Sequence, residues 1–118
     1  MKESNENSLI IDNMNIQNKI YAIRGFQVML DSDLAQLYGV ETKHINQAVR
    51  NNPDKFPDDF YFEMTDDELE NLRSKFLTSS WGGKRYRPKL FTEQGIYMLA
   101  TILKSKVATD ITVKIIRT

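Results

Sequence analysis

A stripe of polar side chains in residues 42–51 has the types and the spacing needed to read nucleic-acid bases. The stripe holds Lys43, Asn46, Gln47 and Arg50 at positions i, i+3, i+4 and i+7, which share one face of a helix. Asn and Gln can bond adenine in a bidentate way, as Arg and Lys can bond guanine. Thr42 begins the same segment and is included among the candidate contacts. The alternative is an ordinary solvated face, such as any surface helix shows.

A turn at Gly39 would set this helix against a shorter one before it. Asp31 or Ser32 is a suitable N-cap for the first helix, and Ala35 is small enough to let two helices cross closely. Gly39 can adopt the positive φ of a tight interhelical turn. The second helix is predicted over 42–51 and is ended by Asn52-Pro53. This layout is typical of a helix-turn-helix, and Gly39-Val40 followed by residues 45–49 resembles that of phage Cro-type repressors.

A second candidate contact lies in a short basic segment. Residues 84–89 hold four positive charges around an aromatic residue, and they are Lys84, Arg85, Arg87 and Lys89. At the tip of a hairpin such an arm would hold phosphates. The alternative is a charged sheet edge that prevents aggregation.

Composition favours one soluble, cytoplasmic domain. The chain has 118 residues, 41% of them hydrophobic, which is enough for a core. It has no cysteine, no apolar run of about 18 residues and no apolar segment near the N-terminus like that of a signal peptide.

Charge is unevenly distributed along the chain, although it sums to zero. The balance is −1 over residues 1–52, −7 over 53–70 and +8 over 71–118. We therefore expect a basic face toward a phosphate backbone and an acidic face away from it.

Enzyme chemistry finds little support. His44 is the only histidine, so no second imidazole could share a metal with it. The acids between Asp54 and Glu68 could suggest a two-metal nuclease, but several suit turns and a helix start better. Gly82-Gly83-Lys84-Arg85 lacks the spacing of a phosphate-binding loop. We expect no catalytic residue, no metal and no cofactor.

The elements around these candidates predict an α+β fold. We expect a flexible tail over 1–15, strands over 16–23 and 26–30 joined at Arg24-Gly25, and a strand over 60–64. A helix over 66–76 would begin with a capping box of Thr65 and Glu68. After a loop over 77–83 and an extended segment over 85–91, Thr92 would cap a helix that breaks near Ser105 before another over 107–117. The result is a small single domain, with the helix-turn-helix between short β-hairpins and a C-terminal helical region.

Four ordered motifs together carry a family resemblance. They are the run from Ile23 to Lys43, Phe56-Pro57-Asp58-Asp59-Phe60, Thr78-Ser79-Ser80-Trp81-Gly82-Gly83 and Phe91-Thr92-Glu93-Gln94-Gly95-Ile96. Over residues 16–118 the chain resembles the KilA-N superfamily of phage DNA-binding domains, in the ORF6N-type branch.

The resemblance implies a small α+β DNA-binding domain, often N-terminal to a variable second domain, in phages, prophages and bacterial genomes. Family members commonly continue beyond the point that corresponds to residue 118. Our expectation is the double-stranded DNA-binding domain of a phage- or prophage-derived transcriptional regulator. The alternative is an antirepressor-like protein-interaction module. In that case segment 53–70 would imitate DNA charge, and the apolar C-terminal helices would bind a second copy or a repressor.

Overall fold

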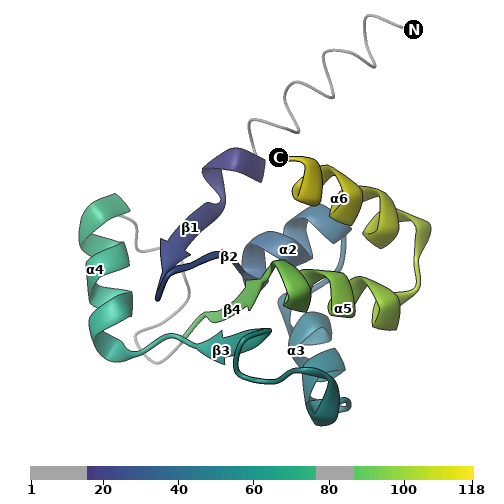
Figure 1. Cartoon of the computed structure of the whole chain (residues 1–118), viewed down its shortest axis with the longest axis horizontal. Helices are drawn as coiled ribbons and strands as arrows, with labels where there is room; N and C mark the ends of the chain where they lie inside the picture. The colour runs from purple at the N-terminus through teal and green to yellow at the C-terminus, as the bar shows by residue number, and fades with distance from the viewer. Residues whose placement is uncertain (1–15, 77–86) are drawn as a thin grey trace, which may run out of the picture.

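A four-stranded antiparallel sheet forms the centre of the fold (Figure 1) in the residues that the computed structural model describes, 16–76 and 87–118. The strands are β1 (Ile20–Ile23), β2 (Phe26–Leu30), β3 (Tyr61–Glu63) and β4 (Lys89–Thr92), and their order across the sheet is β1-β2-β4-β3. β1 and β2 form the predicted hairpin. Its two turn residues, Arg24 (φ 57°) and Gly25 (φ 79°), have the positive φ of a turn that matches strand twist.

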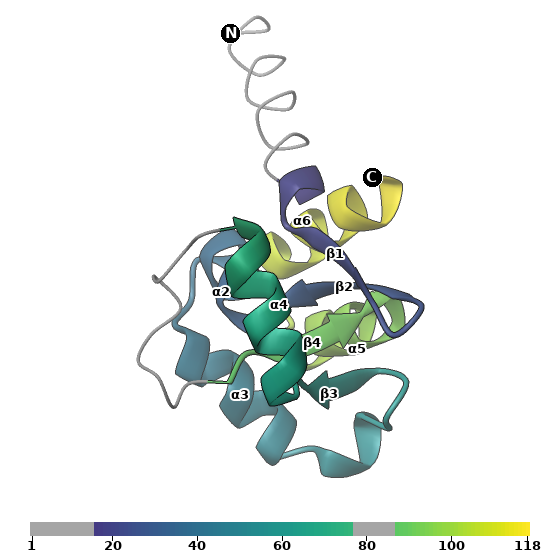
Figure 2. The ribbon, with the colours of Figure 1, turned by 90° about the vertical axis from the view of Figure 1, so that its left-hand side faces the viewer.

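Alternation along the strands divides the apolar side chains between two cores. On one face, Leu30, Leu90 and Phe62 lie opposite one another across β2, β4 and β3. Helix α4 (Asp66–Phe76) covers that face through Leu69 and Leu72. In Figure 2, α4 lies in front of the sheet, with α5 behind it.

The other face carries the larger core. Its sheet row is Met29 and Phe91, with the half-buried Tyr61 beside them. The labelled helices that pack against it in the described ranges are α2 (Asp31–Tyr38), α3 (Thr42–Arg50), α5 (Glu93–Leu103) and α6 (Lys106–Arg117), and Ile16 is buried in the same core. A buried hydrogen bond of 2.8 Å between the Tyr38 hydroxyl and Thr112 Oγ1 ties α2 to α6.

Two helix starts, at Thr65 and Thr92, follow the predicted capping chemistry, and a third is capped by Ser105. Thr65 and Glu68 form the capping box reciprocally: Thr65 Oγ1 accepts from the Glu68 amide at 3.2 Å, and Glu68 Oε1 accepts from the Thr65 amide at 2.8 Å. Thr92 caps α5 by accepting from the Gly95 amide, and Ser105 caps α6 by accepting from the Ala108 amide. The predicted break near Ser105 is confirmed.

Gly95 is required by a close backbone approach. A Cβ at this position would lie 1.9 Å from the carbonyl oxygen of Phe60. That oxygen accepts from the Thr92 amide at 3.1 Å, and the Thr92 hydroxyl donates to the Asp59 carbonyl at 2.7 Å. The segment from Phe91 to Ile96 therefore joins the start of α5 to the segment that leads into β3.

Several local predictions were wrong. Residues 16–18 are helical, so the first strand begins only at Ile20. The N-cap of α2 is Leu30, not Asp31 or Ser32, because the helix begins one residue earlier. Asp31 is then the first helical residue, and its buried Oδ1 accepts from the Ser32 amide at 2.8 Å.

The second predicted hairpin is also different. β3 and β4 are antiparallel neighbours, but the chain between them contains α4, so no short turn joins the two strands. The predicted tail over 1–15, the loop over 77–83, and Lys84 and Arg85 lie outside the described residues. Within the described ranges, none of the helices combines the length and apolar character needed to cross a membrane.

Candidate nucleic-acid interface

The turn between α2 and α3 is held by backbone hydrogen bonds. Gly39 has φ 75° and ψ 31°, the left-handed conformation predicted for it. The Val40 amide donates to the Ala35 carbonyl at 3.0 Å and the Gly39 amide to the Gln36 carbonyl at 3.3 Å. This is the Schellman arrangement, which fixes the direction in which the chain leaves a helix. The orientation of α3 relative to α2 is thus set by the backbone.

Helix α3 is strongly two-sided. Ile45, Ala48 and Val49 are buried in the larger core. The opposite side is exposed and consists of Lys43, His44, Gln47, Arg50 and the adjoining Asn51. The helix contains no Asp or Glu. A rigidly seated helix therefore presents donors and positive charge to solvent, with no acid of its own among them.

Asn46 does not belong to this exposed side. Its Nδ2 donates to Asp31 Oδ2 at 3.0 Å and to the Thr42 carbonyl at 3.3 Å, and its Oδ1 is buried. With about 100° per residue, position 46 lies at the flank of the buried side rather than at the centre of the exposed one. The predicted base contact is thus occupied by a bond that ties α3 to the first residue of α2. Thr42, also half-buried, lies at the start of α3.

Lys43 and Arg50 are the charged groups of the exposed side. Lys43 Nζ lies 3.5 Å from Glu41 Oε1, with both side chains more than three-quarters exposed (81% and 76%). Such a pair contributes little to stability and leaves the ammonium accessible. Arg50 lies near Tyr61. Burial, together with the charges of Glu63 and Asp31, raises the pKa of Tyr61, and Arg50 opposes this effect.

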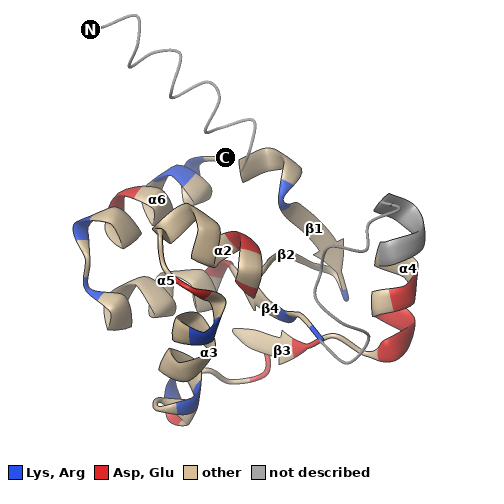
Figure 3. Cartoon of the chain, turned by 180° about the vertical axis from the view of Figure 1, so that it is seen from behind, with Lys and Arg blue, Asp and Glu red and all other residues tan. Residues whose placement is uncertain are grey.

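Among the basic residues 84–89, the structure describes the side chains of Arg87 and Lys89. Arg87 Nη2 lies 2.8 Å from Asp66 Oδ1, and Lys89 Nζ lies 3.5 Å from Glu63 Oε2. Since Glu63 and Lys89 are partners in the β3–β4 register, their side chains meet. In Figure 3, the basic start of β4 lies beside the acidic residues of β3 and α4.

The expected separation into a basic face and an acidic face is therefore wrong for this region. Segments of opposite charge neutralise each other where β3, β4 and α4 meet. Arg24 adds to this pattern: it donates to Glu68 at 2.8 and 3.0 Å and stacks over Phe62, with its Cζ 4.1 Å from the ring centroid.

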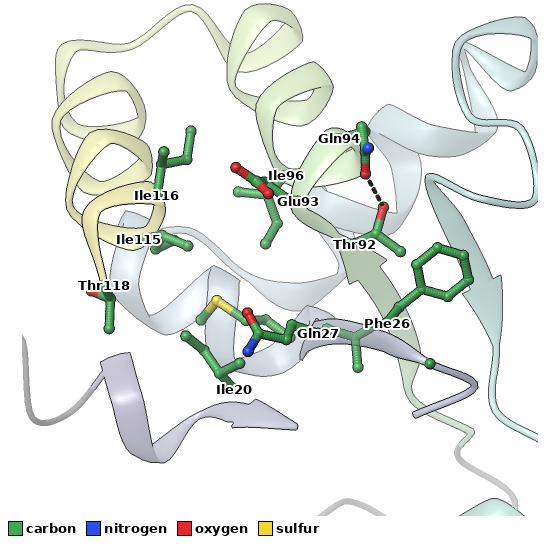
Figure 4. A pocket seen from close by; sticks show the side chains of 13 residues that line it. Ile20, Phe26, Gln27, Thr92, Glu93, Gln94, Ile96, Ile115, Ile116 and Thr118 are labelled. Carbon is green, nitrogen blue, oxygen red and sulfur yellow. Dashed lines mark hydrogen bonds between the residues drawn. The ribbon is translucent and has the colours of Figure 1, made fainter. Parts of the chain in front are cut away.

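A large cleft lies away from α3. Its volume is about 310 Å³, and it is bounded by the β1–β2 hairpin, the start of α5 and the end of α6 (Figure 4). Ile20, Phe26, Ile96 and Ile116 are among its lining residues, and Glu93 is the one acidic or basic side chain among the described residues that line it. In the described part of the chain, no group of three or more His, Asp or Glu residues could hold a metal ion.

Neither Asn51 nor His44 was among the candidate contacts predicted from the sequence. Both residues are exposed. The angular positions provided no signal, because at about 100° per residue positions 44, 46 and 51 all lie on the flanks between the buried and the exposed side. What distinguishes Asn46 is its hydrogen bond to Asp31.

These features define a small α+β domain that holds one amphipathic, acid-free helix in a fixed orientation and exposes its polar side. A family model described as the ORF6N domain matches residues 18–102, and the chain belongs to this family. The resemblance inferred from the sequence motifs is thereby confirmed. Among curated proteins and solved structures, none matches the chain. Family membership indicates a phage-type regulatory or antirepressor-like domain.

Proposed function

We propose that the domain binds double-stranded DNA and that α3 is its recognition helix. The observation that carries this proposal is the exposed side of α3, where Lys43, Gln47 and Arg50 stand together without an acidic residue of the helix. Gln suits adenine, and Arg and Lys suit guanine, when a helix enters the major groove. The α2–turn–α3 arrangement is the layout in which such helices are used.

Rigidity supports the same proposal. Base reading requires side chains that start from a fixed backbone, and α3 is fixed at three places. These are the Gly39 turn, the Asp31–Asn46 hydrogen bond, and the buried side chains Ile45 and Val49. Asn46 serves DNA binding indirectly, by holding the helix, rather than by contacting a base.

The contribution of the basic arm is smaller in this proposal than the sequence indicated. Arg87 and Lys89 already have acidic partners, so a phosphate must compete with Asp66 and Glu63 for them. Arg87 remains accessible, with a side chain 48% exposed. We assign base contacts to α3 and count Arg87 as a secondary phosphate contact. No catalytic role is proposed for any residue.

The test is a selection of binding sites from random duplexes, followed by titration at two salt concentrations. We expect an enriched sequence and binding that weakens steeply with salt. Arg50→Ala should cost about 1–3 kcal/mol of binding free energy if Arg50 contacts guanine in a bidentate way. Arg117→Ala, which removes an exposed Arg at the end of α6, is the matched control and should change affinity little. The absence of both an enriched sequence and salt-sensitive binding would refute the proposal.

A second candidate function is binding of a protein, as an antirepressor does. It is favoured by exposed apolar side chains on α6, namely Val107 (52% exposed), Val113 (41%) and Ile116 (42%). Light scattering after size exclusion distinguishes a monomer from a dimer. Capture of a repressor that survives Arg50→Ala would favour this function over DNA binding.

A further inference from the structure

The bend between α5 and α6 carries two lysines on a firmly held backbone. Lys104 ends α5 in the left-handed conformation (φ 56°), and its amide donates to the Ala100 carbonyl at 3.0 Å. Ser105 then caps α6 by accepting from the Ala108 amide at 3.0 Å. The backbone of residues 104–106 is therefore fixed on both sides, and its two lysine side chains extend from a defined place.

This bend adjoins the exposed side of α3. A cleft of about 250 Å³ is lined from α3 and its end by His44, Gln47, Ala48, Asn51 and Asn52, and from the end of α5 by Ile102 and Leu103. Lys104 follows Leu103 directly in the chain. Figure 3 shows the positively charged residues of the bend in blue between α5 and α6. Because Leu103 lines the cleft, the bend begins at the edge of the cleft.

Neither lysine forms a strong ion pair with another of the described residues. Lys104 is exposed and takes part in no ion pair within the described residues. Lys106 is 87% exposed and lies 3.2 Å from Asp110 one helical turn along. An exposed pair of this kind contributes little to stability, so a phosphate can displace it.

A helix in the major groove has a phosphate strand on each side, and neighbouring elements of the protein meet those strands. We propose that Lys104 and Lys106 bind backbone phosphates of the same duplex that α3 reads, with the cleft beside His44 and Asn51 facing that strand. This inference rests on the proposed function. It assigns a phosphate-binding element to the α5–α6 bend, far in sequence from both the α3 contacts and the basic segment 84–89.

The experiment compares wild type with the double variant Lys104→Gln/Lys106→Gln on a duplex chosen by selection, using fluorescence anisotropy between 50 and 200 mM salt. Each lost phosphate contact should lower the slope of log affinity against log salt by about 0.9, or about 1.8 for two. Over this fourfold range of salt, wild type should therefore lose about twelvefold more affinity than the variant. The preferred base sequence should stay the same.

Arg117→Gln is the matched control, because it removes one positive charge at the opposite end of α6. An unchanged slope in the double variant, while Arg50→Ala still weakens binding, would overturn this inference and leave the proposed function standing. A change of slope of about 0.9 in the control, half of that expected for the double variant, would overturn it too, since net charge would then explain the effect. If wild type binds no duplex in a salt-sensitive way, both the inference and the proposed function are wrong.

Discussion

Replacement of Gly95 by Ala should unfold the domain at markedly lower urea, although Ala is the better helix former. The new Cβ would lie 1.9 Å from the Phe60 carbonyl oxygen and 2.8 Å from its carbon. Ordinary carbon–oxygen contacts begin at about 3.3 Å, so the two backbones must separate by about 1.4 Å. The obstacle is backbone rather than the end of a flexible side chain, and it cannot rotate away.

The expected loss of unfolding free energy combines two destabilising contributions and one stabilising contribution. Overpacking a well-filled site costs about 1–3 kcal/mol. Displacing the Phe60 carbonyl weakens its hydrogen bond from the Thr92 amide, now 3.1 Å long, by about 1 kcal/mol. The higher helix propensity of Ala stabilises the folded state by about 1 kcal/mol and offsets part of this cost. We therefore expect Gly95→Ala to lower the free energy of unfolding by about 1–3 kcal/mol, near the upper end because the clash is with backbone.

Urea unfolding followed by circular dichroism measures this loss, and Gly39 supplies the control. No atom lies within 4 Å of a Cβ built at Gly39, where φ is 75°. Gly39→Ala should therefore cost about 1–2 kcal/mol through backbone strain alone, and Gly39→Asn should recover part of it because Asn tolerates this conformation. Gly95→Asn should recover nothing. A Gly95→Ala variant as stable as wild type, or a Gly95→Asn variant that recovers stability, would refute the reasoning.

Two further predictions concern pairs that join distant elements. Hydrogen bonds from Arg24 hold the pKa of Glu68 below its ordinary value of 4.5, so this pair stabilises the fold at neutral pH and the benefit is lost as pH falls through the folded-state pKa. The difference in unfolding free energy between wild type and Glu68→Gln should thus be largest near neutrality and shrink in acid, and a gap constant with pH would contradict this. Asn46→Ala should lower the free energy of unfolding by about 1–3 kcal/mol, because it removes a hydrogen bond to the buried Asp31 carboxylate. Unchanged stability together with weaker DNA binding would instead restore Asn46 as a base contact.

Local chemistry made much of the fold predictable. The capping residues Thr65 and Thr92, the break near Ser105, the left-handed Gly39 and the Arg24-Gly25 turn each depend on neighbours within a few residues, and each was predicted. The helical conformation of residues 16–18 was harder to predict, because apolar side chains at positions 16 and 20 suit a helical turn as well as a strand.

The role of individual site residues was less predictable, because it depends on partners far along the chain. Asn46 meets Asp31, which lies 15 residues earlier and in another helix. Lys89 meets Glu63 only because β3 and β4 pair in one particular register. The distribution of charge along the chain cannot reveal such ion pairs. The sequence therefore suggested that Arg87 and Lys89 were available to bind phosphate, whereas both are paired with acidic residues.

The place of β4 has a consequence for how the domain folds. β4 comes late in the chain, yet it lies between β2 and β3, and its Thr92 pairs with Val28. Contacts between such distant residues require a long loop to close, and they slow folding. During synthesis, α2 and α3 leave the ribosome well before the strand that completes the sheet beneath them. A nascent chain that stops before Lys89 therefore contains α3 but not the sheet that supports it, and the DNA binding that we propose for α3 should arise only once β4 has been made.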